Sequence, residues 1–260
     1  FERIGIISVS NPSQFLETLK LICVVGAPKG KRVAGFTCSG GGATMLADYA
    51  EKIDLIFPTV DPLQENDLAL LLPDIATVSN PLDYTTPIWG QAEMTYPVFL
   101  KAISAFEADS AVLVQDYPAE GLDSSKVFYA NDAMAFATAT KERGLPAIVC
   151  ATLPENMDLE TRQLLIAEGV APMQGIHETL NAINGSAKWV QARTRFQSEE
   201  PKPLLPAFPF SGQKMLTESE GKRWLFENKL NVPEGRVVAA RDVANAADEV
   251  GYPVALKMGS

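Results

Sequence analysis

The chain has 260 residues, enough for one large domain or two smaller ones, and its 47% apolar and 21% charged residues are typical of a folded globular protein. Its net charge of −10 disfavours nucleic acid or an anionic membrane as the main partner. No apolar run approaches the roughly 20 residues that a membrane span needs, so we expect no membrane partner.

The three cysteines, Cys23, Cys38 and Cys150, lie far apart and match no metal-ligand spacing. They suit a reducing compartment, so we expect a cytoplasmic protein without a metal site. The chain opens at Phe1 without a methionine and closes on GYPVALKMGS, a strand-like segment with nothing after it to pack against. We therefore expect a piece of a longer polypeptide.

Residues 1–28 contain one strand-like and one helix-like segment. The apolar stretch IGIISVS (4–10) predicts a strand. Pro12 suits the first turn of a helix, and Ser10 or Asn11 can cap that helix. We interpret these residues as the end of a preceding domain.

Residues 29–195 alternate between strand-like and helix-like segments. The predicted strands are 32–37, 110–115, 146–152 and 170–173, and the predicted helices are 43–52, 122–143, 158–168 and 176–193. Such alternation predicts an α/β domain, with a parallel sheet of about five strands, helices on both faces and right-handed crossovers. This pattern is flavodoxin-like.

The last part of the chain indicates a linker and a new domain. Residues 196–214 include four prolines within 201–209, which predicts a semi-rigid extended linker. In residues 215–260, Thr217 and Glu220 form a capping box for a helix that ends near Asn228. RVVAA (236–240) and PVALKM (253–258) predict strands, and Asp242 caps a helix that ends at Gly251.

Three loops follow predicted strands, at the edge where open parallel sheets bind ligands. Ser39, Gly40, Gly41 and Gly42 lead from the first strand into a helix, whose free N–H groups and positive end can hold an anion. DYPAEGLDSS (116–125) leads into the long helix, and SNPLDYTTPIWG (79–90) is rich in hydroxyl groups. The glycine turn alone favours a purely structural role, but two helix starts at one edge make an anion site about equally plausible.

The remaining candidate side chains favour structural roles. His177, the one histidine, lies in the first turn of a predicted helix and is better explained as a neutral surface residue than as a catalytic one. Cys38 could be an activated thiol, but without a nearby histidine a small buried side chain is the better interpretation. Ser39 lacks the pattern of a hydrolase elbow, so hydrolase chemistry is disfavoured.

The order of several motifs resembles a known family. PKGKRVAGFTCSGGGATMLADYAE (28–51), then NPLDY (80–84) and finally GYPVALK (251–257) are similar to segments of the NDP-forming acyl-CoA synthetases, relatives of succinyl-CoA synthetase. The resemblance covers essentially the whole chain. It implies that residues 1–28 end a first flavodoxin-like domain, that 29–195 form the second, and that 215–260 open an ATP-grasp domain.

The resemblance also implies an activity. In that family ATP phosphorylates a histidine, the phosphoryl group passes to a carboxylic acid, and CoA displaces phosphate to give the acyl-CoA. It implies ATP with Mg and CoA as cosubstrates, and the carboxylic acid as a further partner. The phosphohistidine motif, typically Ser-His-Thr-Gly, is absent from this chain, so we expect no catalytic residue within it and no activity of the chain alone.

Site residues carry over in the same way. The resemblance implies substrate or phosphate binding by the glycine turn and by the loop that follows the predicted strand 110–115. The residues concerned are Ser39, Gly40, Gly41, Gly42, Asp116, Tyr117 and Gly121. It also implies nucleotide-phosphate binding by Lys257. Several relatives have asparagine near Cys38 or Ser39, and the succinyl enzymes have Gly-Gly-Ile-Val where this chain has DYPAEGL. The charge of Asp116 would repel a small dicarboxylate, which disfavours succinate.

Two other functions remain open. The same modules occur as a non-catalytic ligand-sensing region of some protein acetyltransferases. A free-standing flavodoxin-like protein that holds a phosphate or a flavin is a third interpretation, disfavoured by the acidic loop. We also expect packing against the other domains of a longer enzyme, or a homo-oligomer.

Overall fold

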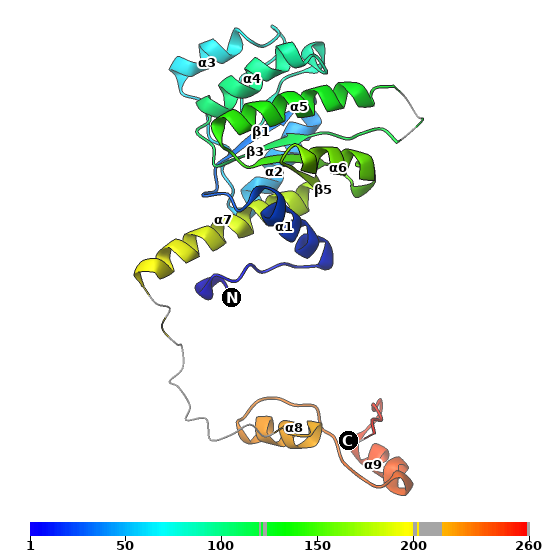
Figure 1. Ribbon diagram of the computed structural model, residues 1–260. Coiled ribbons are helices and arrows are strands. Elements are labelled where there is room, and N and C mark those ends of the chain that lie inside the picture. Colours follow the sequence, from blue (N-terminus) through cyan, green and yellow to red (C-terminus); the bar gives the residue numbers. More distant parts are fainter. Residues whose placement is uncertain (120, 122–123, 200–201, 203–214, 259–260) are drawn as a thin grey trace. The chain divides into compact units, whose positions relative to one another are not determined.

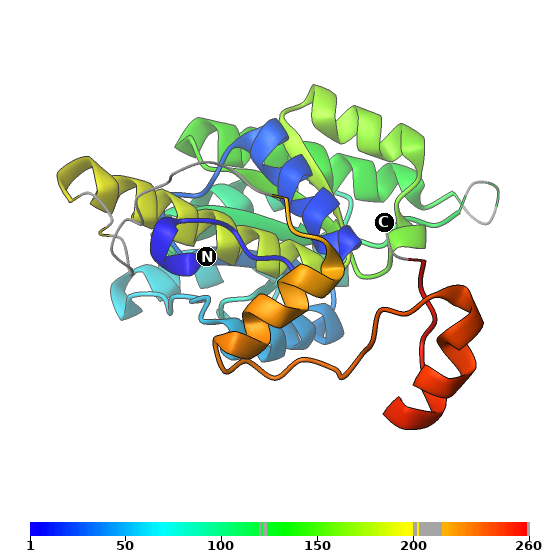
Figure 2. The ribbon, with the colours of Figure 1, turned by 90° about the horizontal axis from the view of Figure 1, so that it is seen from below.

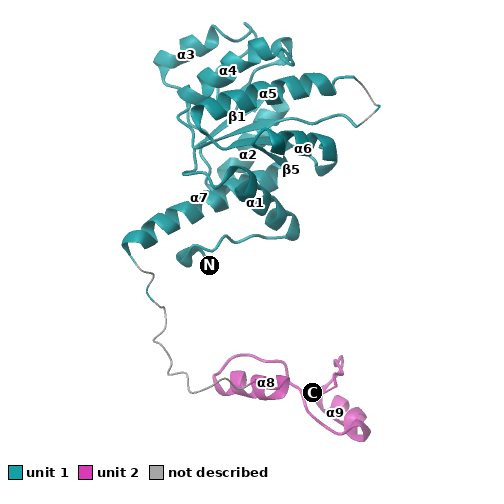
Figure 3. Cartoon of the chain, in the orientation of Figure 1, with its two compact units in different colours: residues 1–202 teal, residues 203–260 magenta. Residues whose placement is uncertain are grey.

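The computed structural model describes residues 1–119, 121, 124–199, 202 and 215–258. The chain divides into two compact units, residues 1–202 and 203–260 (Figure 3). The first unit is an α/β domain built on one parallel sheet, and the second is described below by itself.

The five strands of the first unit are all parallel and lie in the order β2-β1-β3-β4-β5. Their bounds are β1 Val33–Thr37, β2 Leu82–Asp83, β3 Ser110–Val114, β4 Ala147–Ala151 and β5 Val170–Gln174. Every residue of β1, β3 and β4 is buried, as expected of parallel strands covered on both faces. The predicted flavodoxin-like α/β fold is confirmed.

Two helical layers cover the sheet (Figure 1). The first layer contains α1 Pro12–Val25, α2 Gly40–Ile53 and α7 Ile176–Ser198. The second contains α3 Pro62–Ala69, α4 Ala92–Ala105, α5 Lys126–Arg143 and α6 Leu159–Ala167. Alternate strand residues enter the two cores: Val112 packs in the first layer, whereas Ala111 and Leu113 pack in the second.

Local signals in the sequence account for several helix ends. The Asn11 side chain accepts a hydrogen bond from Gln14 N at the start of α1, and Asp158 accepts one from Thr161 N at the start of α6. Gly144, with φ of 63°, ends α5 in the left-handed conformation. These predicted boundaries are confirmed.

The N-terminal segment differs from the prediction. Residues 4–10 form no strand: Glu2–Ile4 is a 3-10 turn (η1), Gly5 follows with φ of 70°, and the chain then runs to α1 without joining the sheet. Helix α1 packs beside α7 (Figure 2) and against β5, where Glu17 Oε2 accepts a hydrogen bond from Gln174 N at 3.0 Å. An apolar run becomes a strand only where a neighbouring strand offers hydrogen-bond partners. Residues 4–10 pair with none of the five strands, and α1, which follows them, packs against α7 and β5.

The second unit contains α8 Glu218–Glu227, the 3-10 turn η4 Ala240–Asp242 and α9 Val243–Val250. The predicted capping box of Thr217 and Glu220 is present. The predicted strands 236–240 and 253–258 are not strands, because the described part of this unit has no other strand to pair with them. Helix α7 continues through residues 196–198 of the predicted linker, whereas 200–201 and 203–214 lie outside the described residues.

Candidate functional site

The strand order identifies the part of the sheet edge where a ligand site is expected. After β1 the chain enters α2 in one layer, and after β3 it enters α5 in the opposite layer. Strands β1 and β3 are neighbours, with Phe36 opposite Leu113, so their carboxyl ends form the topological switch point of the sheet. Open α/β sheets bind ligands in the crevice at such a point. The glycine turn and the Asp116 loop lie on its two sides.

The glycine turn starts α2 without a side-chain cap. Ser39 is the N-cap residue in an extended conformation, and its side chain makes no capping hydrogen bond. The first N–H groups of any α-helix have no partner within the helix, and here they belong to Gly40, Gly41 and Gly42. Because Gly40 and Gly41 are exposed, these donors and the positive helix end are accessible to an anion.

The three glycines differ in the space around them. A Cβ atom on Gly42 would lie 2.6 Å from Thr37 Oγ1, so close packing on β1 requires glycine there. At Gly41 the nearest atom to an added Cβ would be Ser39 Oγ at 3.6 Å, and at Gly40 it would be Asp83 Oδ2 at 3.6 Å. Packing within the chain therefore explains Gly42, whereas an added Cβ at Gly40 or Gly41 would make only an ordinary van der Waals contact.

The loop after β3 is anchored by Asp116. Its carboxylate accepts hydrogen bonds from Thr152 N at 2.8 Å, Thr152 Oγ1 at 2.7 Å and Asn156 Nδ2 at 3.0 Å. Asp116 thus joins the carboxyl end of β3 to the segment that follows β4. The sequence analysis expected the charge of Asp116 to repel a small dicarboxylate. In the structure, three hydrogen-bond donors already compensate that charge.

The other two predicted residues of this loop lie in different surroundings. Tyr117 is 5% exposed, and its hydroxyl donates to Gln115 Oε1 at 2.7 Å. Gly121 is exposed, has φ of 80° and has no atom within 4 Å of an added Cβ. Residues 120, 122 and 123 of the predicted site loop lie outside the described residues. Tyr117 therefore supports the loop from the core, while Gly121 lies at its surface.

A buried polar cluster lies beneath the switch point. Asp132 of α5 is fully buried, and it accepts hydrogen bonds from Tyr84 Oη at 2.9 Å, Gly90 N at 3.0 Å and Thr95 Oγ1 at 3.0 Å. Burial raises the pKa of Asp132, although these hydrogen bonds oppose the shift. The cluster holds the loop 79–90 onto α5.

Cys38 lies next to this cluster. Burial, with a further contribution from Asp132, raises the pKa of the Cys38 thiol to about 11. The thiol is therefore protonated at neutral pH, which argues against a nucleophilic role because the thiolate is the reactive form. This environment agrees with the interpretation of Cys38 as a small packed side chain.

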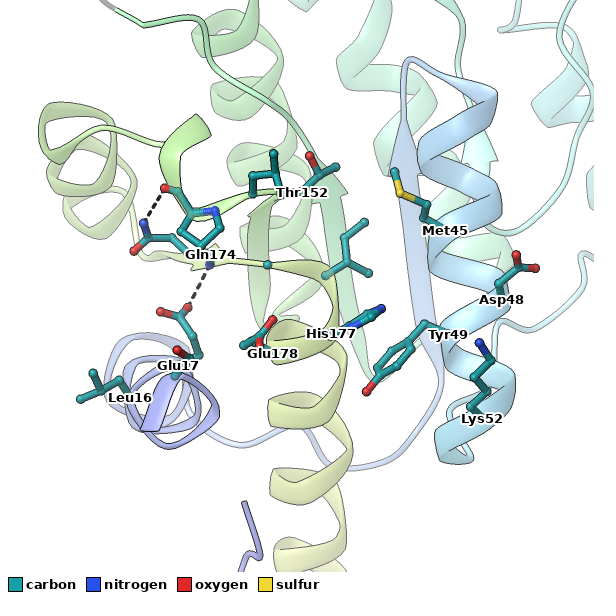
Figure 4. Close-up of a pocket in the computed structure, with 15 residues that line it drawn as sticks. Leu16, Glu17, Met45, Asp48, Tyr49, Lys52, Thr152, Gln174, His177 and Glu178 are labelled. Carbon is teal, nitrogen blue, oxygen red and sulfur yellow. Dashed lines mark hydrogen bonds between the residues drawn. The ribbon is translucent and has the colours of Figure 1, made fainter. Parts of the chain in front are cut away.

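A cavity of about 630 Å³ opens at the carboxyl ends of β4 and β5 (Figure 4). It lies within the range of about 300–1,000 Å³ that is usual for small-ligand sites. Its lining comes from α1, α2, α7 and the segments after β4 and β5: Ser13, Leu16, Glu17, Met45, Asp48, Tyr49, Lys52, Thr152, Leu153, Pro154, Gln174, Gly175, Ile176, His177 and Glu178. Thr152 also binds Asp116, so the cavity adjoins the switch-point loop.

Among these residues, the sequence analysis considered only His177 as a candidate functional residue, and it interpreted His177 as a surface residue. The imidazole is exposed and stacks on the ring of Tyr49, with centroids 3.9 Å apart and an interplanar angle of 16°. Figure 4 shows the two side chains meeting between α7 and α2. One sequence signal pointed to this cavity: Thr152 and Gly175 each follow directly after a strand. The other walls come from helices that are distant from one another in the chain, so the sequence did not indicate them.

Lys257 lies in the second unit, where its side chain is 66% exposed. Its Nζ atom is 3.1 Å and 3.2 Å from the two carboxylate oxygens of Glu218. Lys257 therefore lies at the surface and pairs with the Glu218 carboxylate. A nucleotide phosphate would have to replace this carboxylate in order to contact Lys257.

No three His, Cys, Asp or Glu side chains among the described residues come together in a way that could hold a metal ion. None of the helices described is long and apolar enough to cross a membrane.

Comparisons with known proteins find likeness in structure rather than in sequence. No protein-family model and no curated protein matches the chain. PH0766 from Pyrococcus horikoshii OT3 is 19% identical with a TM-score of 0.60, and the match covers 72% of this chain and 42% of that one. The dinucleotide forming acetyl-coenzyme A synthetase 1 of Ca. Korarchaeum cryptofilum, in its apo form, is 18% identical with a TM-score of 0.58, covering 76% and 42%.

The Korarchaeum enzyme was also solved in complex with phosphate and ADP. That structure is 18% identical with a TM-score of 0.57, and the match covers 74% of this chain and 40% of that one. The chain thus spans about two fifths of the structures that it matches. At this identity the likeness establishes the fold, and the chain has the flavodoxin-like α/β fold found in this acetyl-coenzyme A synthetase.

Proposed function

We propose that the chain is part of an NDP-forming acyl-CoA synthetase, which joins a carboxylic acid to CoA with ATP hydrolysed to ADP and phosphate. The observation that carries the proposal is the switch point between β1 and β3, where an open glycine turn starts α2. A structural neighbour that carries phosphate and ADP gives further support.

In this proposal the chain binds and orients the phosphoryl and acyl groups. The N–H groups of Gly40 and Gly41, with Ser39 beside them, hold the anion without a side chain in the way. Asp116 keeps the opposite loop in place through Thr152 and Asn156. Lys257 contacts nucleotide phosphate. The phosphohistidine, the CoA-binding domain and most of the ATP-grasp domain, which would hold ATP with Mg, belong to other parts of the enzyme.

The glycine turn provides the test. Gly41→Val in the full-length enzyme should remove acyl-phosphate formation, because the branched side chain would occupy the space above the N–H donors. The fold should survive, since no atom lies closer than 3.6 Å to the added Cβ. Ala47→Val, at an exposed position of the same helix, is the matched control and should retain turnover.

A second measurement examines binding alone. Addition of inorganic phosphate to the 260-residue chain should shift the amide NMR signals of Gly40 and Gly41, and Gly41→Val should abolish the shifts. Unchanged turnover and unchanged shifts in Gly41→Val would leave the turn with a structural role only. Phosphate binding without turnover in the full-length protein would favour the ligand-sensing module.

A further inference from the structure

A second cavity, of about 350 Å³, lies between α5 and α6. Its lining consists of Tyr117, Lys126, Val127, Ala130, Ala133, Glu160, Thr161, Leu164 and Leu165. It shares no residue with the 630 Å³ cavity lined by α1, α2 and α7. Its volume lies at the lower end of small-ligand sites.

Small side chains on α5 leave this space unfilled. Ala130 and Ala133 are three residues apart and so share one face of the helix, where larger residues would reach α6. The ring of Tyr117 and the side chain of Leu165 are buried at the inner side, and Val127 and Leu164 are 55% and 44% exposed. The cavity therefore has an apolar interior, and its opening combines the apolar Val127 and Leu164 with the charged pair of Lys126 and Glu160.

The one cation in the lining is already compensated. Lys126 Nζ lies 2.7 Å from Asp158 Oδ2 and 3.0 Å from Glu160 Oε2, so it joins the starts of α5 and α6. The hydrogen bond to Asp158, with a further one to Glu160, raises the pKa of Lys126. The cavity thus offers no free positive charge to a carboxylate, and its lining is complementary to an uncharged hydrocarbon group.

The position of the cavity relates it to the switch point. Tyr117 belongs to the loop that leaves β3, and Lys126 and Val127 form the first turn of α5, which that loop enters. A hydrocarbon group held here would leave its polar end near the carboxyl edge of the sheet. We propose that this cavity holds the alkyl chain or aromatic ring of the carboxylic acid, so that the substrate is a hydrophobic monocarboxylic acid. This inference rests on the proposed function.

Binding to the 260-residue chain tests the inference directly. Acetate, butanoate, hexanoate and phenylacetate would be titrated by calorimetry. Each methylene that enters the cavity should tighten binding about fourfold, the equivalent of about 0.8 kcal/mol per buried CH₂. Affinities independent of chain length would overturn the proposal.

Variants locate the binding. Ala130→Leu, which fills the cavity, should weaken hexanoate binding about tenfold or more and leave acetate binding unchanged. Ala167→Leu, at an exposed position on α6 outside the lining, is the matched control. Leu164→Ala, which removes an exposed side chain at the opening and keeps the fold, should shift preference toward phenylacetate. Unaltered hexanoate binding in both Ala130→Leu and Leu164→Ala would overturn the proposal. The proposal would also be overturned if the chain dimerised through the opening of the cavity and bound no acid.

Turnover separates this inference from the proposed function. In the full-length enzyme, Ala130→Leu should raise the ratio of KM for hexanoate to KM for acetate by about tenfold or more. If the full-length enzyme turns over every acid and Ala130→Leu does not change how KM depends on the length of the acid, the inference is overturned and the proposed function stands. A different outcome is that the full-length protein forms no acyl-CoA but binds hexanoate, and that Ala130→Leu removes this binding. That outcome would overturn the synthetase function and leave the cavity as a site for hydrophobic acids.

Discussion

At the scale of single residues, Asp132 has an environment that its sequence position did not indicate. It lies on α5 in an ordinary amphipathic segment, yet it is fully buried and held by three uncharged donors from the loop 79–90 and α4. A buried carboxylate is costly unless hydrogen bonds satisfy it. The hydrogen bonds from the loop favour the charged carboxylate, but burial opposes the charge more strongly, so the net contribution of Asp132 to the stability of the fold is greatest when it is protonated.

The raised pKa of Asp132 gives a pH prediction. When the folded-state pKa of an acid lies above its unfolded value, its contribution to stability is fully present below the unfolded pKa and is lost as the pH rises through the folded pKa. Asp132→Asn removes this titration. The free energy of unfolding of Asp132→Asn should therefore rise relative to the wild type as the pH increases above the ordinary aspartate range.

Urea unfolding between pH 4 and pH 7, followed by circular dichroism, measures this difference. Asp74→Asn removes an exposed carboxylate from the same unit and is the control. A stability difference between Asp132→Asn and wild type that does not change with pH would contradict the assignment.

At the scale of elements, the edge strand β2 depends on one side chain that precedes it. Asn80 accepts from Gly35 N at 2.9 Å and donates to Val33 O at 2.9 Å and Pro58 O at 3.1 Å. These bonds attach the start of the 80–84 segment to β1 from outside the strand ladder. Because β2 has only two residues, the Asn80 side chain replaces hydrogen bonds that a longer strand would supply.

Asn80→Ala should therefore lower the free energy of unfolding of the first unit by about 2–4 kcal/mol, because three hydrogen bonds of about 0.5–1.5 kcal/mol each are lost and Gly35 N–H loses its partner. Denaturant unfolding followed by circular dichroism measures the effect. Asn228→Ala, which removes a single exposed hydrogen bond in the second unit, is the control. A loss below about 0.5 kcal/mol would show that the strand ladder alone holds this edge.

At the scale of the whole molecule, the chain would supply one part of the proposed synthetase reaction. It spans 40–42% of the structures that it matches, and it contains no Ser-His-Thr-Gly motif. The one candidate nucleotide contact, Lys257, is an exposed lysine, and a single exposed ion pair contributes too little for micromolar binding.

The 260-residue chain mixed with ATP, Mg, CoA and a panel of carboxylic acids should therefore release no ADP. In the full-length enzyme, Lys257→Ala should raise KM for ATP by about tenfold or more, whereas Lys229→Ala, another exposed lysine of the second unit, should not. Robust turnover by the 260-residue chain would contradict the assignment of missing parts. Normal kinetics of Lys257→Ala would remove its nucleotide role.

The sequence by itself determined the features that depend on neighbours along the chain. Short apolar runs predicted the strands β1, β3, β4 and β5, and short-range sequence signals predicted Asn11 and Thr217 as helix caps. The glycine turn was readable as a helix start for the same reason. Strand and helix alternation then determined the parallel α/β fold, because such crossovers have few alternative arrangements.

Tertiary structure decided everything that needs a partner distant in the chain. The apolar run at 4–10 found no strand to pair with, while the two residues of β2 became a strand because β1 lay beside them. Asp116, predicted to face substrate, found Thr152 and Asn156 across the sheet edge. The two cavities are spaces between packed helices, and a space between elements has no signature in the residues of any one of them.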